Sequence, residues 1–181
     1  MSAPVLRPVP AGEAANDQAP TDIEPAARRE PLPEWAEVIA EDYPGFEPKE
    51  FLQGAASAYE MIVEAYAIGD VQSIKGFVAK DVLESFQAGI EQRTASGHQM
   101  ALTFVGVETP DVVRSERDGD NFEVELSFRS EQVRATKDAE GNVLDGSEET
   151  VITVVDRWVF ERPVRSRDPN WTLVATQGSN D

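Results

Sequence analysis

The sequence of 181 residues has no cysteine, a single histidine and few basic side chains, with 16 Lys and Arg against 34 Asp and Glu and a net charge of −18. The missing cysteines exclude a disulfide framework, a thiol nucleophile and a cysteine-ligated zinc site. One histidine is too few for a histidine-rich metal site. The negative charge repels phosphate and argues against nucleic-acid binding. The composition therefore predicts an acidic protein without a metal or cofactor.

Long apolar runs are also missing. No stretch approaches the roughly 18 consecutive apolar residues of a membrane-spanning helix. The first residues, MSAPVLRP, lack the charged and apolar regions of a secretory signal. We therefore expect the chain, as given, to be soluble.

Prolines divide the chain, since nine of the twelve fall within the first 48 residues and none lies between Pro48 and Pro110. The first thirty residues have few large apolar side chains to offset backbone ordering, which costs about 1–2 kcal/mol per residue. We predict a disordered acidic tether over residues 1–32 and a flexible tail over residues 178–181. Residues 33–45 are predicted to form a short amphipathic helix and linker, with Trp35, Val38 and Ile39 on one face. Its acidic polar face favours docking on the domain or a partner over binding at a membrane surface.

The periodicity of the remaining chain changes from helical to extended. Apolar residues recur at helical spacing over residues 51–66, 71–78 and 82–90, and Asp81 with Glu84 has the spacing of a capping box. After Gly97, alternation predicts strands near residues 100–104, 122–128, 151–161 and 171–176, with a turn at residues 118–119 and a long hairpin loop over residues 137–149. Helices followed by antiparallel strands indicate an α+β domain.

Two segments have residue types that support chemistry elsewhere. Asp138 to Asn142 places oxygen donors at alternate positions, as in a calcium loop, but Val143 stands where an EF-hand needs glycine. An acidic hairpin tip is the favoured interpretation. His98 follows a helix end and has no evident partner, which favours an exposed loop residue over a general base.

Asp156 is the best candidate for an inward-facing acid, because it lies within a predicted strand between apolar residues. In an apolar pocket such a carboxylate can transfer protons. The alternative is that Asp156 pairs with Arg157, Arg162 or an arginine of a neighbouring strand. Since no other member of a catalytic set is evident, we favour a protein that is not an enzyme.

The basic side chains of the folded part concentrate in one cluster near the C-terminus. This cluster is a candidate docking site for an acidic partner or for lipid headgroups. Acidic residues are interleaved with it, so the favoured alternative is a solvated strand edge with ion pairs worth at most about 1 kcal/mol each. Its members are Arg157, Arg162, Arg165 and Arg167.

Four segments together resemble one known family. FLQGAASAYEMIVEAYAIGD at residues 51–70 is similar to the first long helix of the Tim44-like domain, and TFVGV at residues 103–107 is similar to its first strand. DRWVFER at residues 156–162 and SRDPNWTLVAT at residues 166–176 resemble its C-terminal signature, in which DPNW is the most specific part. The resemblance extends in order from residue 46 to residue 177 and is that of a bacterial member.

The resemblance implies helices packed on a curved, four-stranded antiparallel sheet, a cone like that of nuclear transport factor two, with a large apolar pocket. It implies an adaptor or scaffold without enzymatic activity, associated with protein translocation at the inner membrane. Mitochondrial relatives tether a seventy-kilodalton heat-shock chaperone to the import channel and touch cardiolipin-rich membrane. Bacterial relatives commonly have a membrane span before a polar linker.

We accordingly expect protein partners at the cytoplasmic face of a bacterial inner membrane. A membrane protein or translocase component is the first candidate, and the chaperone is another. The alternative is a lipid or fatty-acyl binding module that uses the pocket. The oligomeric state stays open.

The candidate turn and pocket residues lie in the segments that resemble the family. Asp168, Pro169 and Asn170 are expected to form a tight turn before Trp171, because proline fixes φ and asparagine tolerates a left-handed conformation. Trp158, Phe160 and Trp171 are expected to anchor the sheet or line the pocket, and core packing is favoured for most aromatic residues. The candidate pocket residues are Phe51, Tyr59, Ile62, Tyr66, Trp158 and Phe160.

Overall fold

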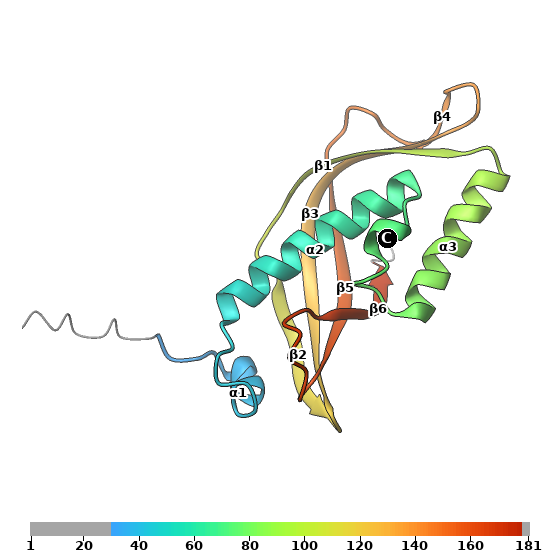
Figure 1. The fold of residues 1–181 in the computed structure, drawn as a ribbon. Helices are drawn as coiled ribbons and strands as arrows, with labels where there is room; N and C mark the ends of the chain where they lie inside the picture. Colours follow the sequence, from blue (N-terminus) through green and yellow to red (C-terminus); the bar gives the residue numbers. More distant parts are fainter. Residues whose placement is uncertain (1–29, 179–181) are drawn as a thin grey trace, which may run out of the picture. The chain divides into compact units, whose positions relative to one another are not determined.

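A computed structural model describes residues 30–178, and the folded unit begins at Leu32. Residues 1–29 of the predicted tether and 179–181 of the predicted tail lie outside the described residues. Helices come first and strands follow (Figure 1). The elements are α1 (Glu34–Ala40), α2 (Pro48–Ile68), the 3₁₀ turn η1 (Gln72–Ile74), α3 (Lys80–Ala95), β1 (Gln99–Val107), β2 (Asp111–Asp118), β3 (Asn121–Lys137), β4 (Val143–Gly146), β5 (Ile152–Pro163) and β6 (Thr172–Gly178).

The long strand β3 organises an antiparallel sheet. Along one edge its first half pairs with β2 and its second half with β1. Along the other edge it pairs with β5 and, near its end, with β4, while β6 pairs with the far side of β5. The turn between β2 and β3 has Gly119 with a φ of 59°, directly after Asp118. This is the position at which the sequence predicted a turn. The predicted α+β class is confirmed.

The sheet has six strands within the described residues, so the expected four were too few. β2 carries the sequence DVVRSERD, whose charged residues hide any alternation of apolar side chains. β4 is four residues long and exposed throughout, and it lies within the stretch predicted as a loop. Gly146 closes β4 with a φ of 75°, and a Cβ there would lie 2.3 Å from the carbonyl oxygen of Arg134. Glycine therefore lets β4 approach β3.

The core lies between α2 and the inner face of β3 and β5. Even-numbered residues of β3 alternate with polar ones, as predicted, and Phe122, Val124, Leu126 and Phe128 are all fully buried. Figure 1 shows α2 crossing this face, with α3 beside it. Tyr59 of α2 stacks on Phe128, with ring centroids 4.5 Å apart. Burial of this alternating stripe is what fixes the register of the sheet.

Local residues set the ends of α2, whereas a contact distant in sequence sets the start of α3. α2 begins with Pro48 at its first position and ends at Gly69, whose φ is 81°. α3 begins at Lys80 after Ala79, and no side chain caps it, so the predicted capping box at Asp81 was wrong. The amide of Ala79 instead donates to the carbonyl of Leu173 in β6. A backbone contact between distant segments thus replaces the local cap.

The helix α1 packs onto its own domain. Ala36 and Ile39 are fully buried, and Trp35 contacts the rings of Phe46 and Phe51. The carboxylate of Asp42, just beyond the helix, pairs with Arg117 of β2. The apolar face of α1 is therefore occupied within the fold.

Across residues 30–178, no helix combines the length and apolar character that crossing a membrane requires.

Candidate functional site

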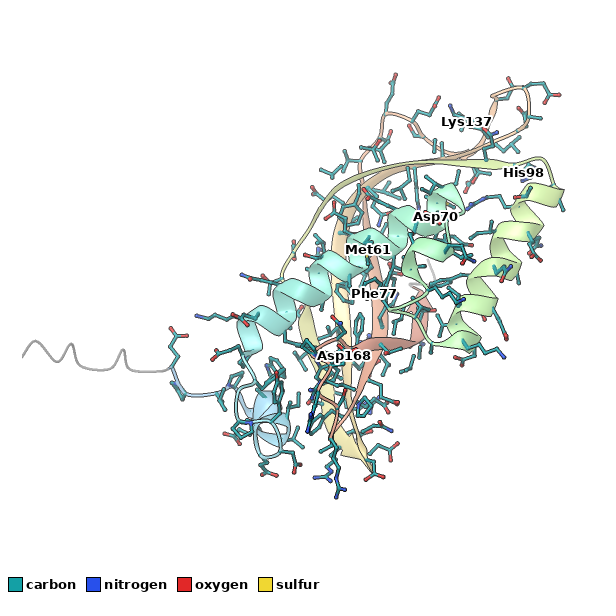
Figure 2. The ribbon with its side chains drawn as sticks, in the orientation of Figure 1. Met61, Asp70, Phe77, His98, Lys137 and Asp168 are labelled. Carbon is teal, nitrogen blue, oxygen red and sulfur yellow. The ribbon has the colours of Figure 1, made fainter. Side chains whose placement is uncertain are left out.

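An apolar pocket of 390 Å³ lies along α2. Its walls come from the α1–α2 connection, from α2 itself, from the segment after η1 and from the loop between β5 and β6. Figure 2 locates Met61 on α2, Phe77 after η1 and Asp168 in the loop between β5 and β6. The lining residues are Tyr43, Gly45, Phe46, Glu47, Glu50, Phe51, Gly54, Ala55, Ser57, Ala58, Met61, Phe77, Phe160, Pro169, Asn170 and Trp171.

A second, more open hollow of 330 Å³ continues the pocket toward the C-terminal end of α2. The two hollows share Ser57 and Met61, so we treat them together as the α2 groove. Ile68 contributes an apolar side chain that is 78% exposed. The second hollow is lined by Ser57, Glu60, Met61, Glu64, Ala65, Ile68 and Ser73.

Aromatic rings form the end wall of the groove. The rings of Phe51 and Trp171 lie 4.8 Å apart, and Phe46 lies 5.6 Å from Phe51 and 6.4 Å from Trp171. Trp35 of α1 supports Phe51 from behind at 5.9 Å. Such ring clusters bury much area and are held by edge and tilted contacts. The wall therefore depends on segments from both ends of the domain.

Arg162 fastens the loop that carries Trp171. Its side chain is 2% exposed, and its Nε and Nη2 donate to the carbonyls of Asp168 and Ser166 at 2.9 and 2.8 Å. Its guanidinium lies 4.5 Å from the centre of the Tyr43 ring. Arg162 thus joins two walls of the groove, and its guanidinium is not available to a docking partner.

The turn before Trp171 forms by side-chain hydrogen bonds. Asp168 Oδ1 accepts from the backbone amide of Asn170 at 2.9 Å and from its side-chain amide at 2.8 Å. No residue other than glycine has a positive φ among residues 30–178, so Asn170 does not use the left-handed conformation that asparagine tolerates. The carboxylate organises the turn without that conformation.

The candidate pocket residues separate into three groups. Phe51 and Phe160 line the groove. Tyr59, Ile62 and Trp158 are at most 5% exposed and belong to the core. The last candidate, Tyr66, packs against Phe86 of α3 at 5.5 Å. Sequence periodicity identified the face of α2 that packs on the sheet, whereas the groove uses the neighbouring face.

A polar cluster lies within the core beside Tyr59. The Tyr59 hydroxyl donates to Asp156 Oδ2 at 2.6 Å and lies 3.1 Å from Ser130 Oγ. Gln132 Nε2 donates to the same Ser130 oxygen at 2.9 Å. Burial first, and then the bond to Asp156, raise the pKa of Tyr59 far above its ordinary value, so the phenol stays neutral and acts as a donor.

Asp156 therefore has a different partner from those expected. It lies opposite Phe128 on the inner side of β5 and is half-buried. Among residues 30–178 its side chain bonds to Tyr59, and no arginine there forms an ion pair with it. It lines neither hollow of the α2 groove. The carboxylate is thus engaged in fastening α2 to the sheet.

Of the four candidate docking arginines, Arg157, Arg165 and Arg167 are exposed. Arg157 lies on the outer side of β5 opposite Ser127, and the other two lie in the loop that Arg162 fastens. Within residues 30–178 these three side chains form no ion pair. Their docking role stays a prediction.

The remaining candidates occupy chain corners. Figure 2 shows His98 in the connection between α3 and β1. Asp138 accepts from the amides of Glu140 and Asn142, at 3.0 and 2.8 Å, and from the Asn142 side chain. These bonds, led by the side-chain bond from Asn142, lower the pKa of Asp138 and give its carboxylate a turn-forming role. In the described part of the chain, no group of three or more acidic or histidine side chains is placed to hold a metal.

The sequence model of one family, the Tim44-like domain, matches residues 35–178. The chain belongs to this family. The match begins within α1 and ends with β6, so the Tim44-like domain comprises the whole described sheet and all its helices.

Among curated proteins, the domain is similar to mitochondrial import inner membrane translocase subunit TIM44-1 of Arabidopsis thaliana, with 21% identity over 128 residues. That stretch covers 71% of this chain but 27% of the relative, so the chain spans about a quarter of its length. Among solved structures, the intermembrane space region of the chloroplast protein ARC6 is similar, with a TM-score of 0.53 and 12% identity. The likeness covers 74% of this chain and 97% of that structure, and it supports the fold alone.

Several groove residues escaped the sequence analysis, among them Tyr43, Gly54, Met61 and Phe77. A signal was present on α2, where Gly54, Ser57 and Ala58 interrupt the larger residues at helical spacing. Tyr43 and Phe77 gave no comparable signal, because their place in the groove depends on contacts across the fold.

Proposed function

We propose that the Tim44-like domain is a non-enzymatic scaffold that docks a polypeptide in the α2 groove. The observation that carries this proposal is an open apolar groove in a domain of this family, with Asp156 outside it and bound to Tyr59. An apolar hollow with a few polar groups at its rim is the usual form of a binding site.

The setting of that docking is part of the proposal. The relative TIM44-1 is a subunit of a mitochondrial inner-membrane import translocase. By analogy, this domain acts in protein translocation or membrane-protein handling at the cytoplasmic face of a bacterial inner membrane. Its partner there is a membrane protein or translocase component, and a seventy-kilodalton heat-shock chaperone is a second candidate. The occupied apolar face of α1 supports attachment through protein contact and not through that helix.

In-cell crosslinking of the full chain tests this proposal. A photoreactive residue at Ser57, exposed in the groove, is compared with one at Glu131, exposed on the outer face of β3. We expect Ser57 to yield adducts with a membrane or translocation protein and Glu131 to yield none of them. Equal adduct patterns from the two positions would overturn docking in the groove.

A lipid or fatty-acyl ligand is the second candidate, because a volume of 390 Å³ walled by aromatic rings suits an acyl chain. Native mass spectrometry of the gently purified full chain decides between them. A bound acyl lipid that is lost in a Gly54→Leu variant supports this candidate. A chain without lipid in both proteins argues against it.

A further inference from the structure

We infer that a separate pocket, on the inner face of the sheet beside β4, binds a small apolar zwitterion: a free amino acid with an apolar side chain or a dipeptide of such residues. This pocket, which we call the β4 hollow, has a volume of 390 Å³ and shares no lining residue with the α2 groove. The inference goes beyond the proposed function, and either can fail without the other.

The β4 hollow lies where β3 extends beyond the core. The inner face of β3 consists of its even-numbered residues, which are buried as far as Gln132. Arg134 and Thr136 continue that face and line the hollow, together with Met100 of β1, which is opposite Thr136. Figure 1 shows β4 at the opposite end of the sheet from α1. The hollow is therefore a site on the sheet itself, away from the aromatic wall of the α2 groove.

Two side chains of opposite charge line the hollow without pairing. Asp145 of β4 lies on the same face as Arg134, because it is opposite Thr136. Among residues 30–178 neither Arg134 nor Asp145 forms an ion pair, whereas the neighbouring Lys137 and Glu148 pair with each other. A ligand that has both a carboxylate and an ammonium group supplies a partner for each.

The charge of the whole protein disfavours a simple anion in this hollow. A chain with a net charge of −18 repels anions, and Asp145 adds to that repulsion locally. A simple cation would pair with Asp145 but would lie close to the charge of Arg134. A zwitterion has no net charge and brings each of its groups to the opposite charge.

Apolar side chains complete the lining. Met100 and Ile152 come from the strands on either side of β3, and Ile152 is 36% exposed. Covering such a side chain with an apolar ligand group removes apolar surface from water, which is favourable. The ligand therefore has an apolar body in addition to its two charges.

A buried acceptor without a partner lies next to the hollow. Gln132 is 1% exposed, and its Nε2 donates to Ser130, but its Oε1 has no hydrogen-bond partner in the described part of the chain. Gln132 is opposite Ile152 and precedes Arg134 on the same face of β3. A buried acceptor left unpaired is costly. An N–H donor of a ligand that enters along this face would satisfy it.

Ligand titrations of the full chain, followed by amide NMR spectra, test the inference. The probes are L-leucine and leucyl-leucine. Two matched compounds each lack one charge of L-leucine: leucinamide lacks the carboxylate and N-acetylleucine lacks the ammonium group. We expect the probes to shift the amides of Thr136, Gly146 and Ile152 with a Kd of about 1 mM. Each matched compound should bind about threefold to fivefold more weakly than L-leucine, the loss expected for one exposed charge pair.

Variants assign the two charges to the two groups of the ligand. Arg134→Gln should bind L-leucine and leucinamide alike, and Asp145→Asn should bind L-leucine and N-acetylleucine alike. The controls Arg129→Gln and Glu131→Gln change exposed charges on the outer face of the same strand and should keep the discrimination of the wild type. Each comparison is between two ligands of one variant, so a general loss of stability does not imitate the expected result.

The absence of shifts at these amides with either probe at about 10 mM, tenfold above the expected Kd, would overturn the inference. Equal binding of L-leucine and both matched compounds by the wild type would also overturn it, and so would discrimination that persists in Arg134→Gln and Asp145→Asn. Binding of one probe without the other supports the inference and identifies the ligand as a free amino acid or as a dipeptide.

Discussion

Arg162 offers the sharpest test of how the groove is built, through the variant Arg162→Met. The side chain gives two charged hydrogen bonds, at 2.9 and 2.8 Å, to the loop that carries Trp171. Each such bond contributes about 1.5–3 kcal/mol, and a desolvated cation–π contact like that with Tyr43 adds up to about 2 kcal/mol.

An opposing effect reduces this total. Arg162 is buried, and its Nη1 has no hydrogen-bond partner, so methionine removes an expensive buried charge while keeping most of the apolar stem. We therefore expect the free energy of unfolding to fall by about 2–3 kcal/mol. For a domain of this size that lowers the unfolding midpoint by about 5–10 °C.

Arg157→Met is the matched control, because Arg157 lies exposed on the same strand. It should change the free energy of unfolding by less than about 0.5 kcal/mol. Urea unfolding followed by tryptophan fluorescence gives both values, and amide hydrogen exchange over residues 163–171 reports the loop directly. If the two variants unfold alike and the loop keeps its protection, the assignment of Arg162 as the fastening of the groove wall is refuted.

Three further variants test other contacts. Because folding raises the pKa of Tyr59, the phenol loses its proton above about pH 10 in the unfolded chain but keeps it in the folded chain. The free energy of unfolding of the wild type should therefore fall as the pH rises above about 10, by up to about 1.4 kcal/mol per pH unit. Urea unfolding between pH 8 and 11 should show the free energy of unfolding of Tyr59→Phe falling less steeply with pH than that of the wild type. Identical slopes for the two proteins would contradict this. Arg93→Met removes two bonds to the carbonyls of Tyr66 and Ala67 at the end of α2 and should cost about 1–3 kcal/mol in thermal unfolding; no loss would contradict capping by Arg93. Gly146→Ala places a Cβ against the backbone and should abolish exchange protection in β4, and retained protection would refute that close approach.

Features set by short-range pattern were predictable. The apolar spacing of residues 51–66 and Gly69 predicted α2, and the alternation from Phe122 to Phe128 predicted the buried stripe of β3. Both patterns report which face of an element is buried, and burial is what orders these elements. The α+β class followed from their order along the chain.

Features set by distant contacts were not predictable. Asp156 meets Tyr59 from 97 residues away, and the start of α3 is fixed by the Leu173 carbonyl of β6. From the sequence, Arg162 is expected to be a surface charge. It is buried, because backbone carbonyls of the loop that follows it accept its hydrogen bonds. The residues next to each partner in the sequence do not indicate these contacts. For the same reason, two of the six candidate pocket residues, Phe51 and Phe160, line the groove, and the other four face the core or α3.

The central claim is that the α2 groove is the docking surface. Backbone and methyl NMR spectra of the full chain, recorded during titration with the partner segment that crosslinks at Ser57, test it most directly. The account predicts progressive shifts at Gly54, Ser57 and Met61, with Glu131 and the rest of the outer sheet face unchanged. Shifts confined to the outer face, or no shifts at segment concentrations that saturate binding, would contradict it.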